Sequence, residues 1–308
     1  LKSRLQMSFQ SSGHTTSALR ALSYGSPLSK FKDDTDGIGF YEVVRDIEEH
    51  FEEKKAELIQ NLKQLSRQIF RVDNVMISYT SSEDGLAPME AAFREIKDTL
   101  YPELDGEEIP CVLHGRKRNE GFKTSSKVQY VARVGNFIDH GAQYHGALQI
   151  LKVILSYDYL WQNVRVKGGA YGCMSNFNRI GEGYLISYRD PNLKKTMEVY
   201  EGVVDYLKNF TVDERDMTKY IIGTISNIDR PMNPAAKGDR SMNLYMNHVS
   251  QEMIRTERSQ ILHAAQEDIR ALAAVVEAML KAEQICVIGS EEKIEEEKEM
   301  FLEVKTLF

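Results

Sequence analysis

Helix-like and strand-like hydrophobic patterns flank a glycine pair in the middle of this sequence. These patterns restrict the possible fold more than any other feature of the sequence. Apolar and polar residues alternate over 128–134, which predicts a half-buried strand. A helical pattern follows from Ala142 to Gln162. After the glycines, residues 171–178 and 183–190 alternate again around the turn "RIGEG". This spacing predicts a β-hairpin packed on a helix.

The C-terminal third continues with helices and one more strand. Helices are expected over 192–210 and over 211–229, the second with Thr211 as its N-cap. A Pro/Asn/Gly loop at 230–239 leads to further helices, a short strand at 284–289, and an acidic helix from about Glu291. The order predicts an α+β fold, a largely antiparallel sheet packed on helices on one side.

The N-terminal third has a different composition. Residues 11–39 are rich in Ser, Thr and Gly, with a short helix expected only at 18–23. A long amphipathic helix is predicted over 41–71, and a strand at 75–79. A second helix at 87–101 leads to a basic loop at 113–126, which is either a solvated connection or a contact for an anion or acidic peptide.

Bulk properties exclude several classes of protein. With 308 residues, 42% of them hydrophobic, the chain can bury the core of one large domain or two. It has no apolar run of about 18 residues, so no membrane span is expected. A net charge of -7 argues against a nucleic-acid binder with a broad basic surface.

The three cysteines, Cys111, Cys173 and Cys286, are far apart in sequence and form neither a disulfide framework nor a CxxC site. They fit a reducing, intracellular compartment, and we expect a cytoplasmic location. The sequence opens at Leu1 with no visible signal peptide, and we expect it to be a piece of a longer protein.

A zinc-dependent hydrolase needs at least two metal-ligating side chains on one face and a third nearby, and this sequence has no motif that provides them. Neither HExxH nor HxxEH occurs, and in "HFEEK" Lys54 stands where a second ligand would be. His140 and His145 are poorly placed as a pair on either a helix or a strand. There is no GxSxG, KGGAYG is not a phosphate loop, and Cys173 is expected to be a core residue. We expect no metal to be bound by this chain alone.

The remaining candidates are Arg165 and Tyr171, six positions apart around Gly168 and Gly169. On a helix or an extended strand their tips would diverge, so only a turn can bring them together, and two glycines permit one. An arginine fork and a tyrosine hydroxyl converging on one oxygen would stabilise the negative charge of an acyl-transfer transition state. The alternative is a helix-capping arginine and a half-buried strand tyrosine.

The stretch around Arg165 and Tyr171 resembles a known family of proteins. "NVRVKGGAYG", the hairpin "CMSNFNRIGEGYLISYRDPN" and the helix "TMEVYEGVVDYLKNF" are similar to the C-terminal half of pitrilysin/insulinase-type metallopeptidases, and most of all to the presequence-protease branch. The resemblance covers essentially the whole chain and is most specific over 127–241. It implies a pitrilysin-like metallopeptidase fold, with the end of a preceding domain at 1–88 (long helix plus strand) and a complete C-terminal domain at 89–308.

The resemblance also implies a mechanism. In this family the N-terminal half carries zinc and HxxEH, and the C-terminal half closes over a short unstructured peptide. An arginine and a tyrosine reach the substrate carbonyl, and the matching residues are Arg165 and Tyr171, with Gly168 and Gly169 as the hinge. The implied partners are peptide substrates and the N-terminal half of the same protein. Zinc is expected in the full-length enzyme, and neither zinc nor activity in this chain alone.

Two alternatives stay open. The chain could belong to a non-catalytic member of the superfamily, with a structural or partner-activating role, and the presence or absence of HxxEH in the full protein would decide this. The helix at 41–71 could be a coiled-coil arm, although it spans barely four heptads and lacks several seam and flank residues.

Overall fold

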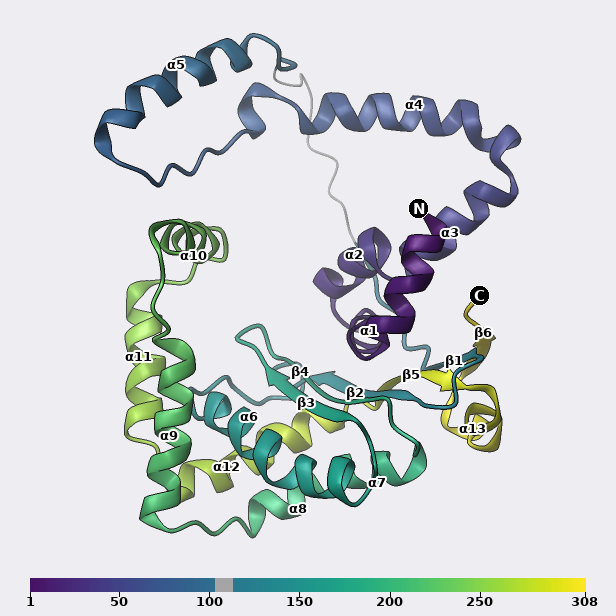
Figure 1. Ribbon diagram of the computed structural model, residues 1–308, viewed down its shortest axis with the longest axis vertical. Coiled ribbons are helices and arrows are strands. Elements are labelled where there is room, and N and C mark those ends of the chain that lie inside the picture. The colour runs from purple at the N-terminus through teal and green to yellow at the C-terminus, as the bar shows by residue number, and fades with distance from the viewer. Residues whose placement is uncertain (103–112) are drawn as a thin grey trace. The chain divides into compact units, whose positions relative to one another are not determined.

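A computed structural model describes residues 1–102 and 113–308, which form two compact units (Figure 1). We call the one that holds the sheet the sheet unit; its described residues are 1–44, 113–229 and 255–308. The other, the helical unit, comprises residues 45–102 and 230–254. The predicted boundary between 88 and 89 stays a prediction about family domains.

The sheet unit is built on one six-stranded sheet of described residues, in the order β3-β4-β2-β5-β1-β6 (Figure 1). The pairings from β3 to β5 are antiparallel, while β1 runs parallel to β5 and to β6. The α+β, largely antiparallel prediction is therefore confirmed. The strands are β1 Glu120–Thr124, β2 Tyr130–Asn136, β3 Gly172–Phe177, β4 Glu182–Tyr188, β5 Gln284–Ser290 and β6 Glu303–Thr306.

Helices cover both faces of this sheet, so the prediction of helices on one side was wrong. Val131 of β2 belongs to the core on one face and Ala132 to the core on the other, and both are fully buried. The alternation in β2 therefore marks two buried faces, not one. The first face packs on helices α6 Ala147–Tyr157, α7 Lys194–Glu201 and α12 Gln266–Leu280, and α8 Val203–Lys208 packs against α12. The second is covered by α1 Lys2–Leu22, against which α2 Pro27–Asp36 packs.

Helix α1 corrects the expectation of a mostly irregular segment at 11–39. Its sheet-facing side carries small residues, and a Cβ added at Gly13 would lie 2.2 Å from the ring of Tyr130. The hydroxyls of Thr16 and Ser17 donate to carbonyls of their own helix. Small side chains let the helix lie directly on the sheet, and the same composition made the segment look like a loop.

A buried ion network fixes α1 to the sheet. The guanidinium of Arg20 donates to both carboxylate oxygens of Glu120 at 2.6 and 2.9 Å, and to Asp33 at 2.6 Å. Glu120 also accepts from Tyr24 at 3.0 Å and from Lys305 at 2.8 Å. Burial alone would raise the pKa of the Glu120 carboxyl, but Arg20 and Lys305 outweigh it and lower the pKa to about 2.

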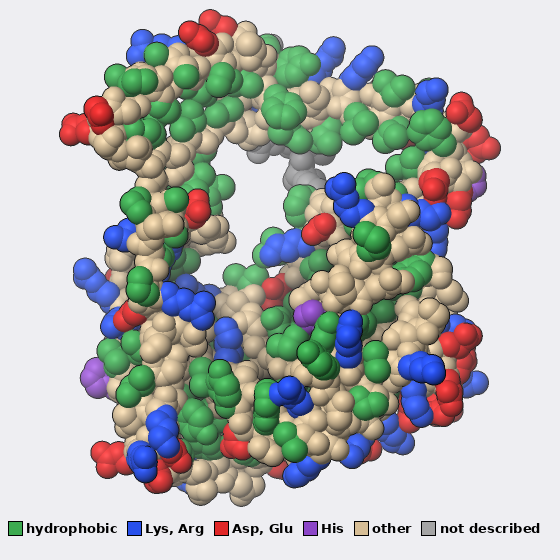
Figure 2. All heavy atoms as spheres, in the orientation of Figure 1, with side chains coloured by type: hydrophobic (Ala, Val, Ile, Leu, Met, Phe, Trp, Pro, Cys, Tyr) green, Lys and Arg blue, Asp and Glu red, His purple; other side chains and the backbone are tan. Residues whose placement is uncertain are grey.

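The helical unit exposes its apolar side chains. The predicted helix at 41–71 breaks at His50 into α3 Ile38–Glu49, which begins in the sheet unit, and α4 Phe51–Ile69. The predicted strand at 75–79 is irregular. None of the described residues of α4 is buried. Figure 2 shows hydrophobic side chains along α4. The large apolar residues of this helix that are exposed are Phe51, Ile59, Leu62, Leu65 and Ile69. The helix after Gly85 is confirmed as α5 Leu86–Lys97.

Several predicted boundaries move by a few residues. The predicted helix at 142–162 begins only at Ala147, and the basic loop at 113–126 ends early because β1 starts at Glu120. Asp213, not Thr211, caps α9, since its carboxylate accepts the amide of Asp216 at 2.8 Å. The loop at 230–239 ends at Asn233, which caps α10. The remaining helices are α9 Glu214–Ile228, α10 Pro234–Met246, α11 Gln251–Leu262 and α13 Glu291–Glu296.

Candidate functional site

Arg165 lies in a π-helical turn, Trp161–Val166, that follows α6. Its guanidinium carbon is 3.9 Å from the centroid of the Trp161 ring, a close cation–π contact. Among the described residues Arg165 has no carboxylate partner within ion-pair distance. The stacking holds the side chain in one place and leaves the guanidinium N–H groups available to an oxygen ligand.

The chain then turns sharply at the glycine pair. Gly169 has φ +83, in the left-handed region that favours glycine, and its amide donates to Arg165 O at 2.9 Å. A Cβ at Gly168 would lie 2.4 Å from the carbonyl oxygen of Val164. Gly169 is therefore needed for its backbone angles, and Gly168 because there is no space for a side chain. The structure places a defined turn here, while the hinge motion stays a prediction.

Tyr171 emerges from this turn directly before β3. Its amide donates to the carbonyl of Tyr188 at 3.0 Å, and its ring meets the Tyr188 ring edge-on with centroids 5.8 Å apart. The side chain is 68% exposed, and its hydroxyl has no hydrogen-bond partner in the part of the chain that the structure describes. Arg165 and Tyr171 thus stand at the two ends of one turn, each steadied by a different aromatic ring. The structure leaves their roles as a prediction.

A clamp that sequence reasoning missed holds the turn from the other side. The Asn192 side-chain amide donates to the carbonyl of Gly168 at 2.6 Å, and the Asn192 backbone amide donates to Asp190 at 2.9 Å. Asp190 is buried, accepts from Thr196 at 2.7 Å, and has a raised pKa because burial disfavours its charge. The "DPN" sequence signalled a turn, but nothing in it indicated that Asn192 would reach Gly168.

Cys173, next to the turn on β3, is unsuited to act as a nucleophile. Burial raises the pKa of its thiol to about 11, and the positive charge of Arg165 opposes this only in part. The thiol is therefore neutral at pH 7 and packs against the core, in line with the sequence prediction. Cys173 and Cys286 are both free thiols, and Cys111 lies outside the described residues.

The histidines do not gather into a metal site. His140 is exposed, and His145 accepts the amide of Ala147 at 3.2 Å. Across residues 1–102 and 113–308, no three or more His, Cys, Asp or Glu side chains form a group that could hold a metal ion. Over the same residues, no helix combines the length and apolar character that crossing a membrane requires. The basic residues of the 113–126 loop pair with acidic ones, as Arg116 does with Glu303 and Lys117 with Glu283, which favours the solvated connection.

Comparison with known proteins assigns the chain to a family. The family model described as "PreP C-terminal domain" matches residues 119–291, more than half of the chain. The chain belongs to this family. The match contains the whole of the Arg165–Asn192 site and confirms the resemblance to the C-terminal half of presequence-protease-type peptidases.

Curated relatives extend the similarity along the chain. Protein HypA of Clostridium perfringens (strain 13 / Type A) is 39% identical over 307 residues, which cover 99% of this chain and 31% of the relative. Presequence protease 1, chloroplastic/mitochondrial, of Arabidopsis thaliana is 27% identical over 308 residues, 99% of this chain and 28% of that protein. The chain thus spans less than a third of the length of these relatives. A solved protease structure from Helicobacter pylori aligns with a TM-score of 0.45 and 16% identity, covering 64% of this chain and 52% of that one.

Proposed function

We propose that this chain is the C-terminal, substrate-binding half of a zinc metalloendopeptidase that cleaves short unstructured peptides in a closed chamber. The proposal is supported by the family match and by the names of its relatives, several of which are presequence proteases. The observation that carries it is the turn that presents the donors of Arg165 and Tyr171, neither of which has a protein acceptor among the described residues.

In this proposal the two side chains act on the scissile carbonyl. The Arg165 fork and the Tyr171 hydroxyl donate to the carbonyl oxygen and strengthen these bonds as negative charge develops on it. Trp161 and Tyr188 hold the two donors in place, so that little reorganisation is needed during the reaction. The described residues do not fit a zinc ion, so we assign zinc and HxxEH to the preceding half and expect this chain alone to be inactive.

The test uses the full-length protein with Arg165→Ala and Tyr171→Phe made separately. Cleavage of a quenched-fluorescent peptide should fall about 100-fold in kcat/KM for each variant, the scale of losing a transition-state donor. Zinc content and the circular dichroism spectrum should be unchanged. Lys167→Ala is the matched control, because Lys167 is an exposed cation on the same turn, and its ammonium donates to Asn163. Unchanged kcat/KM in both variants would show that the turn is only structural and that Arg165 and Tyr171 do not act on the substrate.

A further inference from the structure

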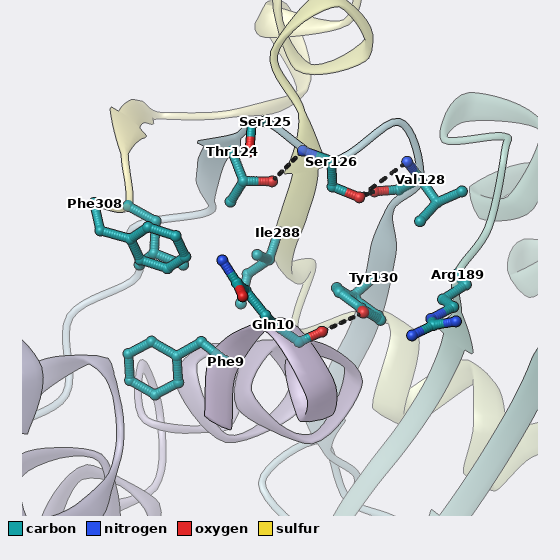
Figure 3. Close-up of a pocket in the computed structure, with 11 residues that line it drawn as sticks. Phe9, Gln10, Thr124, Ser125, Ser126, Val128, Tyr130, Arg189, Ile288 and Phe308 are labelled. Atoms are coloured by element: carbon teal, nitrogen blue, oxygen red, sulfur yellow. Dashed lines mark hydrogen bonds between the residues drawn. The ribbon is translucent and has the colours of Figure 1, made fainter. Parts of the chain in front are cut away.

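A second site lies in the sheet unit, separate from the Arg165–Tyr171 turn. It is a pocket of about 440 Å³ between α1 and the ends of β1, β4 and β5. Figure 3 shows the rings of Phe9 and Phe308 at one end and Arg189 at the other, with Ser125 on the rim. Binding pockets for small molecules and peptide side chains typically measure about 300–1,000 Å³ and combine apolar walls with a few polar groups.

Hydrogen bonds within the protein order the floor of this pocket and the turn on its rim. The Tyr130 hydroxyl donates to the carbonyl of Gln10 at 2.7 Å, which ties the pocket floor to α1. Thr124 and Ser126 stabilise the β1–β2 turn, since the Ser126 amide donates to Thr124 Oγ1 at 3.2 Å and the Ser126 hydroxyl to Val128 O at 3.0 Å. The polar groups of the turn are thus largely satisfied within the protein. A preformed pocket binds without the entropic cost of ordering its walls.

Arg189 adds a cation at the pocket mouth. It has φ +49, a left-handed backbone conformation that is uncommon for a residue other than glycine. The amide of Tyr171 approaches its carbonyl at 3.3 Å, and its guanidinium lies 5.4 Å from the centroid of the Tyr188 ring. No carboxylate of the described residues forms an ion pair with Arg189. Strained residues of this kind persist where the surroundings hold them, often at ligand sites.

A chain of aromatic contacts joins the pocket to the proposed catalytic turn. The Tyr171 ring contacts Tyr188 at 5.8 Å between centroids, and Tyr188 contacts Tyr130 of the pocket floor at 5.6 Å. A peptide bound at Tyr171 can therefore reach the pocket with a residue a few positions away, because an extended chain advances about 3.3 Å per residue.

We propose that this pocket is a substrate subsite that takes a large apolar side chain with a neighbouring carboxylate, the side chain between Phe9 and Phe308 and the carboxylate on Arg189. The identity of the ligand as a peptide substrate rests on the proposed function. The carboxylate can be a peptide C-terminus or an acidic side chain, since both present the same two oxygens to a guanidinium.

Direct binding tests this proposal independently of catalysis. The full-length protein, with EDTA present to prevent cleavage, is titrated with fluorescein-labelled Gly-Gly-Gly-Gly-Phe carrying a free C-terminus. The parallel probes are its C-terminal amide, Gly-Gly-Gly-Asp-Phe amide, and pentaglycine with a free C-terminus. We expect at least one of the two acidic Phe peptides to bind about tenfold more tightly than the neutral amide, as an added charge-assisted hydrogen bond would allow. The stronger of the two identifies the source of the carboxylate.

Two variants and a control decide the outcome. Arg189→Gln should abolish the preference for acidic peptides, and Phe9→Ala should weaken all Phe peptides while leaving pentaglycine unchanged. Lys127→Gln removes an exposed cation of the same turn region, outside the pocket, and should have no effect. Equal binding by wild type and Arg189→Gln would overturn the subsite even if Phe9→Ala failed to fold. Normal binding selectivity in a protein that cleaves no peptide would overturn the proposed function and leave the subsite standing.

Discussion

Replacing Glu120 by Gln should change the free energy of unfolding in a pH-dependent way. Arg20 and Lys305 lower the pKa of this buried carboxyl from 4.5 to about 2. Because the folded-state pKa lies below the unfolded one, the stabilisation is complete above about pH 6 and is lost as the pH falls toward 2. A shift of this size corresponds to about 3.5 kcal/mol at pH 7 and about 1.5 kcal/mol at pH 3.

Glu120→Gln also leaves the buried Arg20 with a reduced set of acceptors, and breaking a buried ion pair costs about 3–5 kcal/mol. Urea unfolding followed by circular dichroism should therefore show a large destabilisation at pH 7 that shrinks by about 2 kcal/mol at pH 3. The control is Glu295→Gln, a half-exposed carboxylate paired with Lys123, which should show no comparable pH dependence. A difference between wild type and Glu120→Gln that stays constant from pH 7 to pH 3 would refute the reasoning.

Two further substitutions test local geometry. Gly13→Ala places a methyl group against the Tyr130 ring and should destabilise the protein by about 1–3 kcal/mol, whereas Gly223→Ala, in an open part of α9, should stabilise it by about 0.5–1 kcal/mol. The opposite order in urea unfolding would contradict the close approach of α1 to the sheet. Asn192→Asp keeps the side-chain shape but removes the donor to Gly168, and should lower kcat about tenfold with little change in KM, since a loosened turn misplaces the donors. A rise in KM alone would instead assign Asn192 to substrate binding.

Elements whose apolar residues recur at a regular spacing were predictable from the sequence. Elements that are buried through small or charged residues were not. The hairpin β3–β4 and the strand β5 were found at nearly their observed positions because alternation and turn residues agree there. Helix α1 was missed because its contact with the sheet uses Gly13, Thr16, Ser17 and Ala18, and small or polar residues carry no apolar periodicity. Its burial depends on tertiary contacts that no local window contains.

The edge strand β6 and the start of β1 were missed for a different reason. Glu120 stands in a polar, basic stretch, and it is fully buried only because Arg20, a hundred residues away in sequence, neutralises it. The strand Glu303–Thr306 is short, and its parallel pairing with β1 depends on residues far away in the chain. A charged residue in a strand is expected to be exposed unless its partner is known. The sequence therefore contained no sign of the buried start of β1 or of the neighbouring strand β6.

The candidate site shows the same division. The need for a turn between Arg165 and Tyr171 follows from the spacing alone, because neither a helix nor a strand can bring both tips to one oxygen. The spacing does not show how a turn built on two flexible glycines keeps a fixed geometry. In the structure, the Trp161 ring stacks on the Arg165 guanidinium, and the Asn192 side chain donates to the carbonyl of Gly168. These partners make the turn rigid enough to serve as a pair of positioned donors. The pair Gly168–Gly169 therefore supplies the shape of the turn, and its neighbours supply the preorganisation that transition-state stabilisation requires.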